Sequence, residues 1–353
     1  MARNGRAERG ATIVDVARRA GVSAMTVSRV INGRSSVRPE TRAAVERAIE
    51  ALAYAPNTAA RSLVRSAELR IGIIYSNPSA AFMSEFLTGI YEEASSTGAR
   101  LVLLKGEGGR PPAQAALKRF RKSALSGVIL APPLGETRGV LSAVRSWGLP
   151  VAAIGAYDVD GVACVRIDDR SAAFEMTRHL LDLGHRKIGF VLGNPDQTAS
   201  AERMAGFYAA IREVGGVEVK VAQGDFSYAS GLLAGEQLLG GDERPTAIFA
   251  SNDDMAAAIV SVAHRRHLDV PSELTVAGFD DTSAAVTLWP PLTTVHQPLR
   301  RLAAEALAAV TAAASAGSTV AMRQATILDH SIVKRESVAR PLGVWSPDRD
   351  PGA

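Results

Sequence analysis

Apolar residues recur at helical spacing in three segments of the first 52 residues. The first predicted helix has Thr12 as its N-cap and ends at Gly21, and the second has Ser23 as its N-cap and ends near residues 32–34. The third begins at Pro39, a residue suited to the first helical turn. The predicted inward residues are Ile13, Val16, Ala17, Ala20, Val27, Val30, Val45, Ile49 and Leu52. Two helices joined by a short turn containing Gly, with a third to close the core, predict a helix-turn-helix domain.

Beyond residue 68 the pattern changes to short apolar runs that alternate with longer helical stretches. Most of the runs are uninterrupted, which is typical of parallel strands covered on both faces. The eight strand candidates are RIGIIYS, ARLVLLKG, SGVILAP, LPVAAIGA, RKIGFVLG, TAIFASND, LTVAGFDD and LTTVHQP. Strand–helix alternation predicts an α/β core of doubly wound parallel sheets, and eight strands suggest two subdomains rather than one.

Charge is distributed unevenly along the chain. Residues 1–65 carry 12 Arg, no Lys and five acidic residues, a net charge of +7, whereas the remaining 28 basic and 31 acidic residues give −3. A basic head on a mildly acidic body indicates a nucleic-acid-binding module joined to a domain of another kind. Cys164 is the only Cys, so a disulfide framework is excluded. With no signal peptide or membrane-spanning run, we expect a cytoplasmic protein without membrane contact, cofactor or metal.

The second helix of a helix-turn-helix enters the DNA major groove, where its first residues face base edges. Arg29 can donate two hydrogen bonds to guanine, whereas Ala24 and Met25 offer apolar contacts, for instance to a thymine methyl. Short polar side chains suit phosphate contacts, which fix the register on DNA, although such residues could also be helix caps. The polar DNA-binding candidates are Thr12, Ser23, Thr26, Ser28 and Asn32.

The order and spacing of these residues resemble the DNA-binding head of the LacI/GalR (lactose/galactose repressor) family. The matching segments are TIVDVA, AGVSAMTVSRVIN, VRPETR and YAPNTAARSL. The resemblance implies a hinge helix at residues 57–63, from Asn57 to Leu63, that forms on operator DNA, with Leu63 as a minor-groove wedge beside Ala60. An apolar side chain inserted between base steps kinks the duplex, and added contacts offset the unstacking. Without the resemblance, Leu63 is an ordinary linker residue.

The body is similar to the effector-binding core of the same family, which is related to periplasmic sugar-binding proteins. Two α/β subdomains around a cleft can enclose a small polar molecule at the carboxyl ends of their strands. The resemblance implies that Arg203 reaches this ligand, and its planar fork suits vicinal hydroxyls or a carboxylate. Phe82 and Phe226 could instead be core residues, and Asp280 a helix cap. The remaining effector-binding residues implied are Ser76, Phe82, Phe226, Asn252 and Asp280.

The strand–helix rhythm restarts near residue 169, which predicts a change of subdomain there. We expect a head at 1–56, a hinge helix and linker at 57–68, and a tail at 343–353. The core N-terminal subdomain comprises 69–168 plus 298–328, and the core C-terminal subdomain 169–297 plus 329–342. The tail has no Leu heptad, so we expect no tetramerising coiled coil.

These features predict a sequence-specific transcriptional regulator, a repressor of carbohydrate-utilisation genes. We expect a homodimer on a palindromic operator, because one head alone reads too few bases. A sugar in the cleft would control operator affinity; a purine or other metabolite, or a solute-binding protein without a DNA role, are the alternatives.

An enzyme is not expected. The first strand lacks the Gly-rich turn of a dinucleotide site, and His264 and His267 have no partner at metal-ligand spacing. Paired Asp residues begin at positions 168, 253 and 280 and follow strands, so we interpret them as helix caps rather than as catalytic carboxylates.

Overall fold

The computed structural model describes residues 13–23, 26, 27, 30, 39–52, 69–106, 110–241, 243–317 and 325–342. The chain divides into two compact units, a head at Met1–Glu68 and a body at Leu69–Ala353, which are described separately. Most of the predicted DNA contacts lie outside the described residues. These are Thr12, Ala24, Met25, Ser28, Arg29, Asn32, Asn57, Ala60 and Leu63.

The head contains α1 (Ile13–Ala20) and α3 (Pro39–Ala51), which pack against each other, and Thr26, Val27 and Val30 are helical between them. Gly21 ends α1 with a φ of +68°, a conformation that favours glycine. The predicted starts of both helices and the predicted end of α1 are confirmed, whereas α3 ends at Ala51, before the end of the predicted run at Tyr54. One small core joins the three helical segments, formed by Val16, Ala17, Val27, Val30, Val45 and Ala48.

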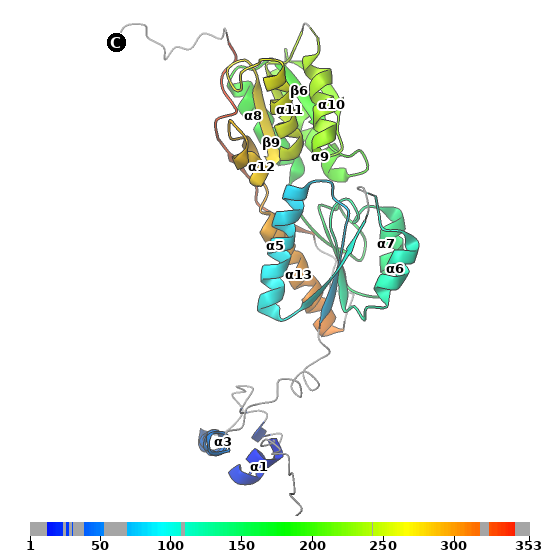
Figure 1. Ribbon diagram of the computed structural model, residues 1–353, viewed down its shortest axis with the longest axis vertical. Helices are drawn as coiled ribbons and strands as arrows, with labels where there is room; N and C mark the ends of the chain where they lie inside the picture. Colours follow the sequence, from blue (N-terminus) through cyan, green and yellow to red (C-terminus); the bar gives the residue numbers. More distant parts are fainter. Residues whose placement is uncertain are drawn as a thin grey trace, which may run out of the picture. The chain divides into compact units, whose positions relative to one another are not determined.

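The body contains two six-stranded sheets among its described residues (Figure 1). Sheet A has the order β11-β5-β4-β3-β1-β2 and is parallel throughout. Its strands are β1 (Arg70–Tyr75), β2 (Arg100–Lys105), β3 (Gly127–Leu130), β4 (Val151–Ile154), β5 (Ala163–Ile167) and β11 (Thr326–Leu328).

Sheet B has the order β12-β10-β9-β8-β6-β7 and is parallel except for β12, which runs antiparallel to β10. Its strands are β6 (Lys187–Leu192), β7 (Glu218–Gln223), β8 (Ala247–Ala250), β9 (Thr275–Asp280), β10 (Thr293–His296) and β12 (Ser331–Val333). All eight predicted strands are present.

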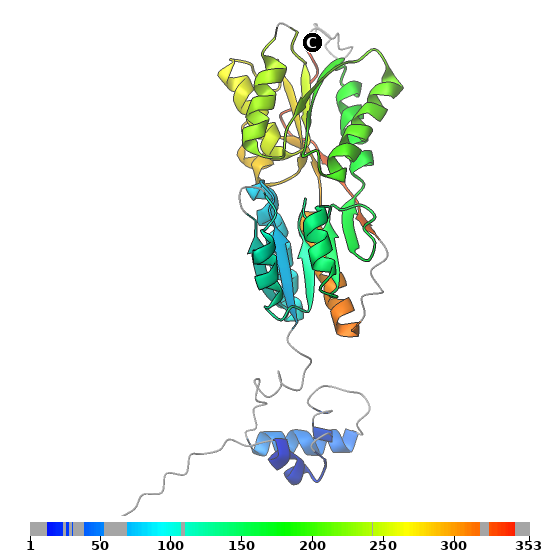
Figure 2. The ribbon, with the colours of Figure 1, turned by 90° about the vertical axis from the view of Figure 1, so that its right-hand side faces the viewer.

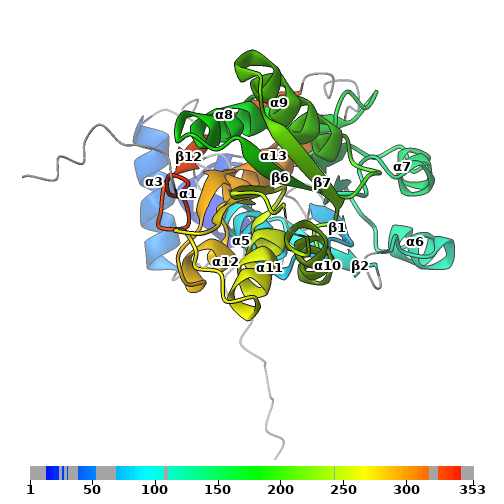
Figure 3. The same ribbon diagram turned by 90° about the horizontal axis from the view of Figure 1, so that it is seen from above.

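Helices cover both faces of each sheet, which confirms the doubly wound architecture (Figures 2 and 3). On sheet A, α5 and α13 pack on one face and α6 and α7 on the other; on sheet B, α8 and α9 pack opposite α10 and α11. The helices are α5 (Ala80–Thr97), α6 (Gln114–Arg121), α7 (Arg138–Arg145), α8 (Asp169–Asp182), α9 (Thr198–Val214), α10 (Tyr228–Leu239), α11 (Asp253–Arg265), α12 (Ser283–Thr287) and α13 (Leu299–Ala316).

Three connections join the sheet-A subdomain to the sheet-B subdomain, each subdomain being one sheet with its covering helices. The chain passes between them from β5 to α8, from β10 to α13 and from β11 to β12. Each of these connections leaves the carboxyl end of a strand. The carboxyl ends of the parallel strands in the two sheets therefore face each other across a cleft. No helix among the described residues is long and apolar enough to cross a membrane.

Candidate functional site

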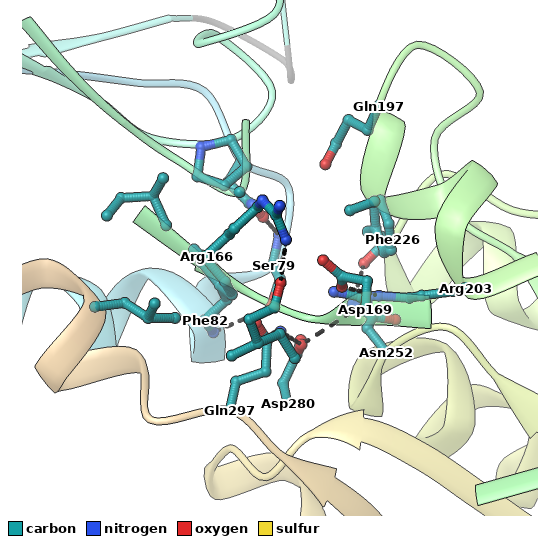
Figure 4. Close-up of a pocket in the computed structure, with 17 residues that line it drawn as sticks. Ser79, Phe82, Arg166, Asp169, Gln197, Arg203, Phe226, Asn252, Asp280 and Gln297 are labelled. Carbon is teal, nitrogen blue, oxygen red and sulfur yellow. Dashed lines mark hydrogen bonds and ion pairs between the residues drawn. The ribbon is translucent and has the colours of Figure 1, made fainter. Parts of the chain in front are cut away.

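A cavity lies between the two subdomains, at the carboxyl ends of their strands (Figure 4). Side chains that follow β1, β3, β4 and β5 line it from one subdomain, and side chains that follow β6, β7, β8 and β9 line it from the other. The space among them, its open mouth included, is about 520 Å³. A crevice at this position is where open α/β sheets bind ligands.

Arg203 enters the cavity from α9, and its side chain is only 7% exposed. Its Nε donates to Oδ1 of Asp169 over 2.8 Å, and its Nη1 donates to the carbonyl of Ser251 over 2.5 Å. The guanidinium also lies over the ring of Phe279, with Cζ 3.6 Å from the ring centroid. The structure therefore brings Arg203 into the cavity, and protein acceptors occupy much of its donor capacity.

Asp280 ends β9 beside Arg203 and is buried. Its Oδ1 lies 4.0 Å from Nη1 of Arg203 and accepts a hydrogen bond from Nε2 of Gln297 over 2.5 Å. Burial raises the pKa of this carboxyl well above its ordinary value, although the nearby guanidinium opposes the shift. The interpretation of Asp280 as a helix cap is wrong, because Thr282 occupies the N-cap position of α12.

The three Asp pairs have different roles. Asp168 is the N-cap of α8, and its Oδ1 accepts from the backbone N–H of Ser171 over 3.0 Å, as predicted. Asp253 is not a cap: its carboxylate is buried and accepts from the N–H of Thr282 over 2.8 Å and from the hydroxyl of Thr294 over 2.6 Å. Burial raises the pKa of Asp253 to about 7. Asp253 thus ties the start of α11 to two neighbouring segments of sheet B.

Phe226 lines the cavity as the resemblance implied, with a positive φ of 73° and 7% exposure. Its ring lies so close to Gly193 that a Cβ there would be 2.0 Å from Cζ of Phe226. Asn252 also lines the cavity, and both ends of its amide are engaged. Its Nδ2 donates to the carbonyl of Phe226 over 2.9 Å, and its Oδ1 accepts from the N–H of Met255 as the N-cap of α11. Asn252 therefore holds the Phe226 backbone as well as facing the cavity.

Phe82 lines the cavity from the first turn of α5 and stacks on Phe86 at a centroid distance of 6.4 Å. Ser76 is the one predicted effector contact that the structure does not bring to the cavity. Its hydroxyl donates to the carbonyl of Arg110 over 2.6 Å. Ser79, three residues further on, lines the cavity instead and caps α5 through Phe82 N–H.

Four further residues of the cleft were not singled out from the sequence. Asp169, Arg166 and Gln197 line the cavity, and Tyr157 lies behind them, where its hydroxyl donates to Oδ2 of Asp169 over 2.9 Å. Burial raises the pKa of Tyr157, and Asp169 adds to the shift. The sequence gives a signal for only one of these residues: Arg166 is a charged residue inside the apolar run ACVRI.

Hydrogen bonds across the cleft hold the two subdomains together. Glu136, which follows β3, accepts from the backbone N–H of Thr198 at the start of α9 over 2.9 Å. The other oxygen of the same carboxylate accepts from the N–H of Tyr157 over 3.4 Å. Together with the bond from Tyr157 to Asp169, this makes a bridge between the subdomains beside the cavity.

In the head, two of the predicted DNA contacts lie within the described residues. Ser23 Oγ accepts from the backbone N–H of Thr26 over 3.2 Å, as expected of an N-cap, and the two hydroxyls lie 2.9 Å apart. Both side chains are thus at the N-terminus of the second helical segment, the end that a helix-turn-helix directs toward DNA.

Comparison with known proteins gives consistent matches over both units. Residues 12–57 match the model of bacterial regulatory proteins of the lacI family, and residues 177–338 match a periplasmic binding protein-like domain. Catabolite control protein A from Priestia megaterium is 34% identical over 304 residues, covering 85% of this chain and 91% of that protein. The chain belongs to the lacI family of bacterial regulatory proteins.

Solved structures of similar proteins agree with this assignment. The Lac repressor dimer bound to operator and the anti-inducer ONPF has a TM-score of 0.69 and 28% identity, covering 94% of this chain and all of that one. A complex of the transcriptional regulator CelR with cellobiose has a TM-score of 0.68 and 28% identity, covering 93% and 99%. This LacI-family regulator therefore combines a DNA-binding head with an effector-binding body, and the expected class of transcriptional regulator is confirmed.

Proposed function

We propose that this LacI-family regulator is a homodimeric repressor whose affinity for a palindromic operator is controlled by a sugar-like effector in the cleft. The observation that carries the proposal is the cavity itself. It lies at the carboxyl ends of both sheets, and Arg203, Asn252 and Asp280 are buried in it beside the ring of Phe226. An aromatic face for a ring and polar groups for hydroxyls form a chemically suitable sugar site. The protein would act by binding rather than by catalysis.

The position of the cavity suggests how an effector would reach the head. Because residues of both subdomains line it, a bound effector stabilises one relative orientation of the two sheets. The three connections between the subdomains would then move together. A change of orientation at the dimer interface would bias whether the hinge segment at 57–63 forms a helix on DNA.

DNA recognition is assigned to the head by the family match and by its basic charge. We propose that Arg29 reads a guanine, that Ala24 and Met25 contact bases, and that Leu63 inserts into the minor groove beside Ala60. Phosphate contacts would come from Thr12, Ser23, Thr26, Ser28, Asn32 and Asn57.

The proposal also gives the bounds of each domain. The head would span 1–56 and the hinge 57–68, and the two core subdomains would divide at residues 168, 297 and 328, before a tail at 343–353. Since bacterial operators are in the cytoplasm, the regulator would act there.

Selection of binding sites tests the proposal. The full chain is incubated with a pool of random duplexes, the retained sites are sequenced, and the best site is bound again with members of a sugar panel. We expect a palindromic site whose affinity changes at least tenfold with one sugar. Arg29→Ala should weaken specific binding by roughly 10- to 100-fold, the loss expected for one bidentate base contact. Arg47→Ala, an exposed and equally charged position on α3, is the matched control. Selection of no site would refute the regulator role.

A further inference from the structure

The cavity contains two arginines, and they are in different electrostatic situations. Arg203 is paired with Asp169 and lies close to Asp280, so its charge is compensated by the protein. Arg166, at the end of β5, forms no ion pair within 4 Å among the residues that the structure describes. Figure 4 shows Arg166 and Arg203 approaching the cavity from different sides. Within the described residues, Arg166 is therefore the cavity cation without an ion pair, although Asp168 lies near enough to feel its charge.

The hydrogen bonds of Arg166 leave most of its guanidinium unused. Within the described residues, its one hydrogen bond is from Nη1 to the carbonyl of Ile167, over 3.1 Å. Its Nε is buried and has no acceptor there. The nearest acidic residue in the sequence, Asp168, uses its carboxylate to accept from the N–H and the hydroxyl of Ser171. A half-buried guanidinium with free donors is costly, because removal from water is not offset by a partner.

The position of Arg166 is nevertheless fixed. Its Cζ lies 4.0 Å from the centroid of the Tyr157 ring, and Tyr157 is in turn held by its hydrogen bond to Asp169. Stacking occupies one face of the planar guanidinium and leaves its N–H edges available. The ring thus holds the donors of Arg166 in a defined orientation, as a binding site for a planar or tetrahedral anion requires.

A second donor without an acceptor lines the same cavity. Gln197, directly before α9, is only 7% exposed, and its Nε2 is buried with no partner in the described part of the chain. Buried amide donors in folded proteins are nearly always satisfied, so an unsatisfied one beside a cavity points to an acceptor on a ligand. Arg166 comes from the sheet-A subdomain and Gln197 from the start of a sheet-B helix. The two donors therefore face the cavity from opposite subdomains.

We propose that the effector carries an anionic group, a carboxylate or a phosphate, which Arg166 binds through its free N–H edge and Gln197 binds through its amide. This inference rests on the proposed function and narrows the effector from a neutral sugar to an acidic or phosphorylated one. Arg203 and Asp280 would contact hydroxyl groups near the ring of Phe226. The anion supplies the missing counterion, so binding removes the cost of an uncompensated cation in the cleft.

The test compares matched neutral and anionic ligands by calorimetric titration of the full chain. The probes are triads of a free sugar, its sugar acid and its phosphate ester: glucose, gluconate and glucose 6-phosphate, and the corresponding compounds of galactose and ribose. We expect an acid or an ester to bind at least tenfold more tightly than the free sugar of its triad. Which of the two binds identifies the source of the anion.

Substitution of the arginine separates charge from shape. Arg166→Gln should weaken binding of the preferred anionic ligand by roughly 10- to 100-fold, the effect of losing charged hydrogen bonds. The affinity for the neutral sugar should stay unchanged. Arg166→Lys should retain part of the preference, because it keeps the charge without the planar fork. Arg119→Gln, on an exposed face of α6, is the matched control for loss of one positive charge. Thermal unfolding confirms that each variant is folded.

Two results would overturn the inference. One is that a neutral sugar binds most tightly and Arg166→Gln leaves its affinity unchanged; the other is that no acid or ester in the panel binds. The DNA experiment keeps this failure distinct from failure of the regulator role. If a palindromic site is selected and a neutral sugar releases it, the proposed function stands and the anionic effector is excluded. If no DNA site is selected but Arg166→Gln weakens binding of an acid, the anionic ligand class is supported and the repressor role is refuted.

Discussion

At the scale of single residues, the cavity depends on side chains that hold one another. Arg203 is placed by Asp169, and Asp169 also accepts a hydrogen bond from the hydroxyl of Tyr157, so one carboxylate positions a cavity residue and a residue behind the cavity. Sequence reasoning found Arg203, Phe226, Asn252 and Asp280 because they occur in family motifs. It could not find Asp169, Arg166 or Gln197, since these matter only through contacts between segments far apart in the chain. It also predicted Ser76 as an effector contact, but Ser76 does not line the cavity and its hydroxyl donates to the carbonyl of Arg110.

Removal of the buried carboxylate of Asp169 should lower the free energy of unfolding. Asp169→Asn leaves Arg203 without its ion-pair partner in a site only 7% exposed, so we expect a fall of about 3 kcal/mol in the free energy of unfolding. Urea unfolding followed by circular dichroism measures this change. Asp182→Asn, at the other end of the same helix, breaks an exposed pair with Arg178 and should cost less than about 1 kcal/mol. Equal losses for the two variants would contradict a special role for Asp169.

The close approach of Gly193 to Phe226 makes a second residue-scale prediction. A Cβ at Gly193 would overlap the ring, so Gly193→Ala should displace Phe226 and destabilise the body by roughly 1 to 3 kcal/mol. The same change should weaken effector binding. Gly139→Ala, on α7, is a suitable control because its Cβ would meet nothing closer than 3.9 Å. An effector affinity that is unchanged in Gly193→Ala would show that the Phe226 ring takes no part in binding.

At the scale of elements, periodicity and apolar runs determined most of the fold. The helices α1 and α3 and all eight predicted strands are confirmed. Except for the edge strand β2, each buries a face or a whole run whose pattern is visible locally. The eight candidates did not include β5, β7, β11 or β12, and β12 has only three residues. The run of β5 is interrupted by Arg166, β7 is an edge strand with alternating Glu, Lys and Gln, and β11 has only three residues. These strands form through pairing with neighbours that the local pattern does not reveal.

The buried carboxyl of Asp253 links elements of sheet B and makes their stability depend on pH. Its pKa in the folded chain is about 7, above the ordinary value of 3.8, so the folded state binds the proton more tightly than the unfolded state. This contribution to stability is therefore complete below pH 3.8 and is lost as the pH rises through about 7. We expect the melting temperature to fall between pH 5 and pH 8 more steeply in the wild type than in Asp253→Asn.

The hydrogen-bond geometry allows that variant to fold. With its amide oxygen toward the N–H of Thr282 and its amide nitrogen toward the hydroxyl of Thr294, Asn can replace a protonated Asp. Asp182→Asn, at an exposed position on α8, is the control for the substitution itself. Identical pH profiles for the wild type and Asp253→Asn would mean that this carboxyl does not titrate in the range.

At the scale of the whole molecule, the body is two sheets joined by three connections and bridged across a cleft. Glu136 contributes to this bridge through the N–H of Thr198, although it does not line the cavity. Glu136→Ala should therefore favour an open arrangement and lower effector affinity several-fold, as expected when a ligand must close the cleft itself. Small-angle X-ray scattering should show a larger radius of gyration without effector. Glu218→Ala, on the exposed edge strand β7, should change neither quantity.

The central claim is that a ligand in the cleft controls DNA binding by the head. The most direct measurement is the fluorescence anisotropy of the selected operator duplex, titrated with the full chain in the absence and presence of the saturating effector. We predict at least a tenfold change in operator Kd for the wild type. For Arg203→Met we predict less than a twofold change, measured against the operator Kd of the same variant without effector. An operator Kd that does not respond to the bound effector would contradict the account.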